Sequence, residues 1–147
     1  MAYDSTIPSL SNLIGDDIPQ MQENFQLLED SQVVDEGSTA DGDYIRYENG
    51  WQICFNSSIE LDFKSSEECL GSWDYPQSFT TIGNVLASAP NLFGDAAPSK
   101  EEISYVGPSG GLSTTSQTLA ATRNQGGTDF EDGDFVEVAL LAIGRWK

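Results

Sequence analysis

The chain has 147 residues, with 24 Asp and Glu against 6 Lys and Arg, no His, and a formal net charge of −18. This charge argues against proteins that neutralise nucleic-acid phosphates and against proteins that dock on anionic membranes, although solubility in salty surroundings explains such acidity equally well. A chain of this length normally folds as one domain that buries about 68–70 % of its unfolded surface. No apolar run approaches the ~20 residues that span a bilayer, and the N-terminus has no basic and apolar regions of a secretory signal, so no membrane insertion is expected.

The residue types that carry most site chemistry are scarce. Without His, the chain lacks the usual general base and the commonest transition-metal ligand. Cys54 and Cys69 are too few for a disulfide framework or a zinc site of their own, and we expect both to be free thiols. The sequence therefore predicts no cofactor, no metal and no catalytic residue.

Residues 1–43 contain no Lys or Arg and predict an acidic segment with one helix over residues 17–30. Asp17 is suited to the N-cap, and Pro19 is tolerated in a first turn. The apolar residues Ile14, Ile18, Met21, Phe25 and Leu28 recur at heptad spacing. This stripe predicts either an amphipathic helix that lies on its own domain or a short bundle made by several copies of the chain. An isolated helix of this length is marginal in water, so either arrangement needs a partner.

Residues 44–55, YIRYENGWQICF, predict a β-hairpin. Asn49 and Gly50 suit a two-residue turn, because both tolerate positive φ. With such a turn Arg46 lies opposite Ile53. One predicted face carries Tyr44, Arg46, Trp51, Ile53 and Phe55, and the other carries Ile45, Tyr47, Gln52 and Cys54. Neither face is cleanly polar, so we expect packing on both sides, the second side being covered by another chain.

The rest of the chain predicts short strands joined by turns. Residues 35–43 have the composition of a linker, and residues 65–71 that of a loop. Strands are predicted at residues 59–63, 82–89, 112–122 and 135–143, with residues 103–106 forming a strand or the end of a capped helical turn at residues 99–102. The last strand is nearly continuously apolar, which indicates burial on both faces. The predicted architecture is mainly β, a short N-terminal helix followed by an antiparallel, jelly-roll-like β-sandwich over residues 44–147.

Carboxylates and aromatic rings are the remaining candidates for a site. Asp129, Glu131, Asp132 and Asp134 could bind Ca²⁺, but their spacing does not match an EF-hand, and a charged turn explains them more simply. Rings beside carboxylates suit sugar stacking, although Trp73 is more simply a core residue. The residues that we select for a possible binding surface are Tyr75, Tyr105, Asp129, Glu131 and Asp134.

Several segments resemble one family. Residues 42–55 are similar to the YIRF-x-[DN]-G-x-QIC-[WF] segment of tail-fibre tip domains from tailed bacteriophages and prophages. Trp73, Pro76 and Phe79 resemble that family's W-x-x-P-x-x-F strand, and residues 140–146, LLAIGRW, resemble its closing AIGRW. The opening MAYDSTIP, with Asn24 and Phe25 in the helix, is similar to short proteins encoded near phage tail genes. Residues 95–124 match least.

The resemblance implies a homotrimeric, non-enzymatic virion protein whose β-rich tip contacts the host surface. Its partners would be its own copies, other tail or baseplate proteins through the N-terminal segment, and a host surface glycan or outer-membrane component. The location implied is the tail tip of the virion, with assembly in the host cytoplasm. A capsid decoration protein is the structural alternative, and a small glycan hydrolase with two carboxylates is the enzymatic one.

Overall fold

The computed structural model describes residues 14–30, 32–88, 91–94 and 97–147. In these residues it contains one α-helix, one 3-10 helix and nine strands. They are α1 (Ile14–Asp30), β1 (Val33–Thr39), β2 (Gly42–Tyr47), β3 (Trp51–Ser65), β4 (Glu68–Asp74), β5 (Thr81–Ala87), β6 (Asn91–Phe93), η1 (Lys100–Glu102), β7 (Ile103–Pro108), β8 (Ser116–Arg123) and β9 (Phe135–Arg145).

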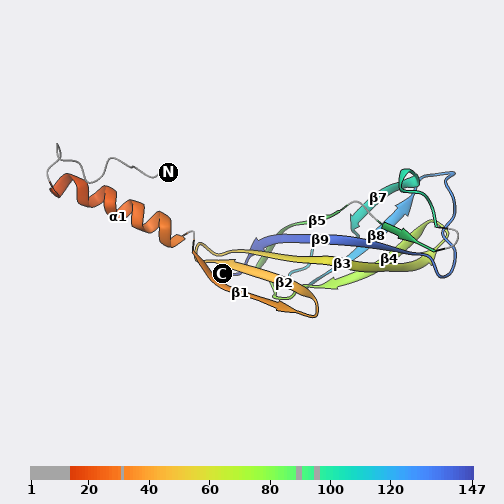
Figure 1. Ribbon diagram of the computed structural model, residues 1–147, viewed down its shortest axis with the longest axis horizontal. Helices are drawn as coiled ribbons and strands as arrows, with labels where there is room; N and C mark the ends of the chain where they lie inside the picture. Colours follow the sequence, from red (N-terminus) through yellow and green to blue (C-terminus); the bar gives the residue numbers. More distant parts are fainter. Residues whose placement is uncertain (1–13, 31, 89–90, 95–96) are drawn as a thin grey trace.

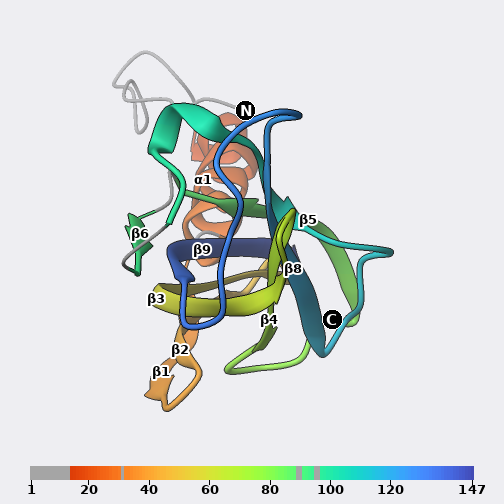
Figure 2. The same ribbon diagram turned by 90° about the vertical axis from the view of Figure 1, so that its right-hand side faces the viewer.

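All strand pairs are antiparallel. Within the described residues, one path of the sheet runs β1-β2-β3-β4-β8-β7, and β9 pairs with β3, β5 and β6. Because β5 also lies against β7, the sheet curls around a single interior. Figures 1 and 2 show this curled body from two sides, with the long strands β3 and β9 running side by side along it. The predicted fold class, a mainly antiparallel β-sandwich-like head with one short helix near the N-terminus, is confirmed.

The interior is built from alternate side chains of the strands. Along β9 every second residue from Val136 to Gly144 is buried, whereas the residues between them are half-buried. Trp73 and Phe130 are the largest fully buried side chains, and Trp73 donates from its indole Nε1 to the backbone oxygen of Asp41 at 2.7 Å. The expectation that Trp73 belongs to the core is therefore confirmed.

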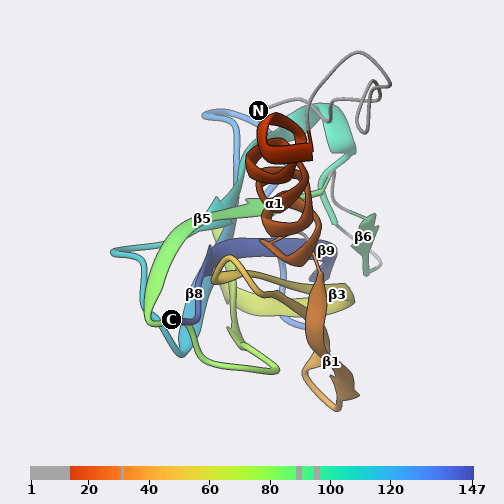
Figure 3. The same cartoon turned by 90° about the vertical axis from the view of Figure 1, so that its left-hand side faces the viewer.

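α1 projects from one end of the sheet (Figures 1 and 3). It begins at Ile14 rather than at residue 17, so Asp17 and Pro19 lie inside the helix and not at its start. Among the predicted stripe residues, Met21 and Phe25 are 37 % and 60 % exposed, and Leu28 is also exposed. The side chains of Ile14 and Ile18 lie outside the described set. The helix therefore does not lie on its own domain. No helix among the described residues has the length and hydropathy needed to cross a bilayer.

The hairpin predicted at residues 44–55 is present, but its register differs from the prediction by one residue. Arg46 pairs with Gln52, not with Ile53, because Glu48 joins Asn49 and Gly50 in a three-residue loop. Of the three loop residues, Gly50 alone has positive φ (89°), as expected for a loop that ends in a left-handed residue. A shift of one residue moves a strand's side chains to the opposite face.

The prediction of a linker at residues 35–43 is wrong, because this segment forms most of the hairpin β1–β2. Thr39 Oγ1 accepts a hydrogen bond from the backbone N–H of Asp41 at 3.1 Å and so closes the turn. The sheet thus begins at Val33, before the expected start of the head at residue 44. The acids of β1 are tolerated because it is an edge strand with solvated side chains.

Other predicted boundaries of strands and loops also differ from those in the structure. The strand predicted at residues 59–63 is the second half of β3, which continues past an irregularity between Asn56 and Ile59. The loop predicted at residues 65–71 is a short turn followed by β4. The capped turn and the strand that were alternatives near residue 103 are both present, as η1 followed by β7.

Candidate functional site

The outward-facing side of the curled sheet is apolar where β2, β3, β9 and β5 lie side by side. Directly paired residues of antiparallel strands share a face. One row across these strands consists of Ile45, Ile53, Ile143 and Asn84, and the next consists of Asp43, Phe55, Leu141 and Leu86. Trp51 adjoins the first row. We call the apolar members of this set the outer apolar face: Ile45, Trp51, Ile53, Phe55, Leu86, Leu141 and Ile143.

This face is exposed in the single chain. Trp51 is 43 %, Phe55 38 % and Leu86 50 % exposed, and the isoleucines between them are only half-buried. A shallow hollow of about 350 Å³ lies beside Trp51 and is lined also by Tyr47. Contiguous apolar patches of this kind are uncommon on soluble monomers and mark interaction surfaces.

The inward-facing side of the same hairpin is polar and fully paired. The Arg46 guanidinium contacts Asp35 at 3.2 Å, and its Nε donates to Gln52 Oε1 at 2.7 Å. It also lies 5.2 Å from the ring centroid of Trp146, a cation–π distance. Gln52 in turn donates to the backbone oxygen of Gln77 at 2.7 Å. This arrangement joins β2, β3, the loop after β4 and the C-terminal end of the chain.

The outward-facing side of β4 and β8 differs from the outer apolar face. Its paired residues are mostly short and polar. They are Glu68 with Thr122, Leu70 with Ala120, Ser72 with Thr118, and Asp74 with Ser116. A surface with this composition is compatible with water.

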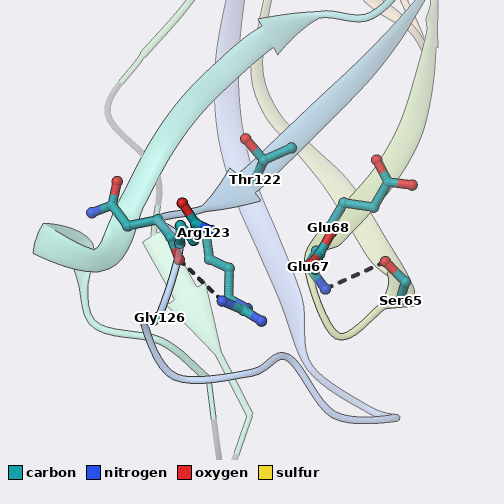
Figure 4. A pocket seen from close by; sticks show the side chains of 8 residues that line it. Ser65, Glu67, Glu68, Thr122, Arg123 and Gly126 are labelled. Atoms are coloured by element: carbon teal, nitrogen blue, oxygen red, sulfur yellow. Dashed lines mark hydrogen bonds between the residues drawn. The ribbon is translucent and has the colours of Figure 1, made fainter.

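A polar hollow of about 520 Å³ lies at the end of the body opposite α1. We call it the tip hollow. Figure 4 shows its two walls, with the turn between β3 and β4 on one side and the end of β8 with the following loop on the other. Its lining consists of Ser65, Glu67, Glu68, Thr122, Arg123, Asn124, Gln125 and Gly126.

Arg123 joins the two walls of the tip hollow. Its Nε donates to the backbone oxygen of Ser66 at 2.8 Å, its Nη1 donates to that of Asn124 at 3.0 Å, and its Nη2 forms an ion pair with Asp129. The side chain is only 11 % exposed. Phe130 also donates from its backbone N–H to Ser66. The walls are therefore held at a fixed separation.

Glu102 holds the loop that forms one wall. Its carboxylate accepts hydrogen bonds from the backbone N–H and hydroxyl groups of both Ser99 and Thr128, at 2.8–3.1 Å. These donors stabilise the ionised form and lower the pKa of Glu102 to about 2. Its backbone oxygen also accepts from the N–H of Asn124.

The residues that we selected from sequence for a binding surface are scattered. Tyr75 is 6 % exposed and packs edge-on against Trp73, and burial raises its pKa to about 12. Asp134 is 3 % exposed and accepts from the backbone N–H of Glu131 at 2.8 Å. Placing these two residues on a binding surface is therefore wrong, because both lie in the interior.

The other selected residues are at the surface, but they do not form one site. Tyr105 is 46 % exposed, and its hydroxyl donates to the backbone oxygen of Pro108. Asp129 pairs with Arg123, and Glu131 is exposed in the turn that precedes β9. No group of three or more His, Cys, Asp and Glu side chains among the described residues is arranged to hold a metal ion. Cys54 and Cys69 are buried free thiols, as predicted, and burial raises the pKa of both.

Sequence reasoning missed the tip hollow and part of the outer apolar face. The apolar face was partly visible in the double-sided apolarity of β9, but the contribution of Ile45 was hidden by the wrong hairpin register. The tip hollow joins residues 65–68 to residues 122–126, and neither segment carries a motif. No local signal in the sequence could have brought them together.

No family model matches the sequence, and no curated protein matches it. Among solved structures, the chain is similar to a fragment of the P. aeruginosa R1 pyocin fibre that comprises C-terminal residues of that fibre. The TM-score is 0.54, and the sequence identity is 13 % over 91 % of this chain. At this identity the likeness shows a shared fold. The match covers 32 % of the fibre chain, so this chain spans about a third of the length of its neighbour.

Proposed function

We propose that the protein is a virion structural protein of the tail-fibre type, whose β head adheres to the host surface without bond-making chemistry. The observation that carries the proposal is the fold shared with the pyocin fibre over 91 % of the chain. Fold alone does not determine function, so the proposal also rests on the surfaces of this chain. The absence of His from the sequence and the similarity to a fibre both favour adhesion over catalysis.

We propose further that the active form is a homotrimer and that the outer apolar face is the interface between heads. The face combines aliphatic and aromatic residues from four neighbouring strands, and three copies around one axis would remove these side chains from water. Each copy brings a formal charge of −18, so the copies repel one another. Apolar burial must therefore offset this repulsion, aided by screening salt.

The helix supplies a second contact between copies. Met21 and Phe25 are exposed on α1, which projects from the end of the head where β1 begins and β2 ends (Figures 1 and 3). In a trimer these side chains would meet their equivalents along a short bundle. The N-terminal segment would then attach to tail or baseplate proteins, which leaves the opposite end of the head for a host glycan or outer-membrane component.

Two measurements on particles that carry this protein test the proposal. Immunogold labelling should place the protein at the tail tip. Label on the capsid would contradict the proposal and favour the decoration protein. Purified protein added in excess should slow adsorption of the particles to host cells, because it occupies the same receptors. Unchanged adsorption, or release of soluble sugars from purified host envelope, would also contradict it.

A further inference from the structure

The tip hollow and the outer apolar face lie at opposite ends of the same strand. Phe55 is near the start of β3 and Ser65 is its last residue. At about 3.3 Å per residue the two positions are roughly 30 Å apart. A trimer that buries the outer apolar face, with α1 directed toward the particle, therefore leaves the tip hollow open at the far end.

The residues that line the tip hollow offer hydrogen-bonding groups and no apolar surface on which a ligand could stack. Glu67 and Glu68 supply acceptors, and Thr122 supplies a hydroxyl group that lies 3.2 Å from the hydroxyl of Ser104. Asn124 and Gln125 have amides that both donate and accept, and one of the two amide hydrogens of Asn124 is held by the backbone oxygen of Glu101. None of the lining residues is aromatic. The volume of about 520 Å³ lies within the range of pockets that bind small ligands.

The charges of the tip hollow argue against an anionic ligand. Arg123 is its only cationic lining residue, and all three guanidinium nitrogens already contact oxygens of Ser66, Asn124 and Asp129. Three of its five N–H donors are therefore engaged, and the remaining two belong to a side chain that is only 11 % exposed, which disfavours bidentate binding of a phosphate or carboxylate. Glu67 and Glu68 would repel such a group, and so would the overall charge of −18.

The walls are fixed before a ligand arrives. Arg123 joins the β3–β4 turn to the end of β8, while Glu102 and Glu101 hold Asn124 through backbone and side-chain hydrogen bonds. Walls of this kind lose little conformational entropy when a ligand binds, which favours recognition of a small, polar group.

We propose that the tip hollow binds one non-acidic, hydroxyl-rich sugar unit of a host surface polysaccharide. The inference rests on the proposed function, because only an adhesive head presents this end to the host. Sugar hydroxyls donate to Glu67 and Glu68 and accept from the amides of Asn124 and Gln125. Binding by a single hollow is weak, and three hollows on one trimer raise the overall avidity.

The test measures binding of the full-length protein to immobilised bacterial polysaccharides, half of them neutral and half carrying uronate or phosphate groups. We expect binding to at least one neutral polysaccharide and to none of the acidic ones. The variant with Glu67→Gln and Glu68→Gln should bind at least tenfold more weakly, as should Thr122→Val, which keeps the shape but removes the hydroxyl. Asp74→Asn, at the other end of β4, is the matched control and should bind as the wild type does.

The outcomes separate this inference from the proposed function. If the wild type and both hollow variants bind equally to polysaccharide and to host cells, the tip hollow is not the site, while adhesion stands. If the wild type binds acidic polysaccharides as tightly as neutral ones, the assigned ligand class is wrong. If the wild type binds neither polysaccharide nor host cells, the proposed adhesive function fails together with the assigned site. Circular dichroism at 25 °C checks that each variant is folded.

Discussion

Two outward-facing regions of one curled sheet differ in character although they enclose the same core. Across β2, β3, β9 and β5 the outward residues are isoleucines, leucines and aromatic rings. Across β4 and β8 they are mostly Ser, Thr, Asp and Glu, or small residues such as Ala120. Both regions enclose fully buried inward residues, such as Cys54 and Ala142 in the first and Cys69 and Leu119 in the second.

We infer from this difference that the fold of the single chain does not require the outer apolar face. β4 and β8 demonstrate that a polar outward side is sufficient for a strand of this sheet. The concentration of large apolar residues in one of the two regions therefore indicates a second packing contact, which we propose is with neighbouring copies. The following changes test whether the two regions are as different in function as they are in composition.

The largest expected effect comes from a charge in the middle of the outer apolar face. Leu141→Asp should convert the proposed trimer to a monomer, because three unpaired carboxylates would be buried in its interface. We expect at least a 100-fold weaker association, equivalent to about 2.8 kcal/mol. Light scattering at micromolar concentration measures the mass, and a monomeric wild type at physiological salt would end the proposal of a trimer.

Thr118→Asp is the matched control on the polar outward side. Thr118 pairs with Ser72 and is exposed, so the new carboxylate stays in water. We expect the mass to stay that of the wild type and the free energy of unfolding to change by less than about 0.5 kcal/mol. Equal dissociation by both variants would show that net charge, and not the apolar face, controls assembly.

The hairpin register explains why sequence alone revealed only part of this surface. Asn49-Gly50 correctly predicted a hairpin, but the pattern could not show that Glu48 joins the turn. The resulting error of one residue placed Ile45 on the wrong side and Arg46 among the apolar residues. In the structure Ile45 continues the row of Ile53 and Ile143.

Non-local pairing accounts for the remaining successes and failures. β9 was predicted because a continuous apolar run is a local signal. β1 was missed because an edge strand tolerates acids and Gly37, which resemble a linker in composition. The tip hollow depends on Arg123 reaching Ser66, a contact between distant residues that no local pattern contains.

The inward side of the same hairpin should respond in the opposite way to the outer apolar face. Arg46→Met keeps the aliphatic volume but leaves Gln52 Oε1 without its donor inside the protein. We expect a loss of about 2 kcal/mol in the free energy of unfolding, since an unsatisfied buried acceptor costs roughly 1–3 kcal/mol. Urea unfolding measures this loss, and light scattering should still report the wild-type mass.

Arg145→Met is the control for this change. The Arg145 guanidinium lies 5.3 Å from the ring centroid of the half-exposed Trp51. We expect a smaller loss than for Arg46→Met, about 0.5 kcal/mol, because exposed cation–π contacts contribute little. Equal losses would show that the polar contacts of Arg46 do not organise the hairpin.

The helix should matter less for assembly than the head does. Phe25→Asp places a charge on the exposed stripe of α1, and we expect an association about tenfold weaker than that of the wild type, with the head still folded. The reason is that a short bundle buries less apolar surface than four strands do. Sedimentation equilibrium measures the effect, and Gln22→Asp, which changes an exposed polar residue of α1, is the control. A loss equal to that of Leu141→Asp would place the main interface in the helix.

The smallest effect is expected at the tip, where Glu102 connects η1 to the loop before β9. Its pKa in the folded state, about 2, lies below the ordinary value of 4.5 because Ser99 and Thr128 donate to the carboxylate. A pKa lowered by folding contributes stability above the ordinary value, and this contribution is lost as the pH falls toward the folded value. In the Glu102→Gln variant the amide hydrogen of Thr128 should therefore exchange faster than in the wild type at pH 7. The difference between the two exchange rates should shrink between pH 4.5 and about 2. Solvent screens this exposed carboxylate, which keeps the effect local and small. A difference that stays constant over this pH range would mean that Glu102 acts through shape and not through its charge.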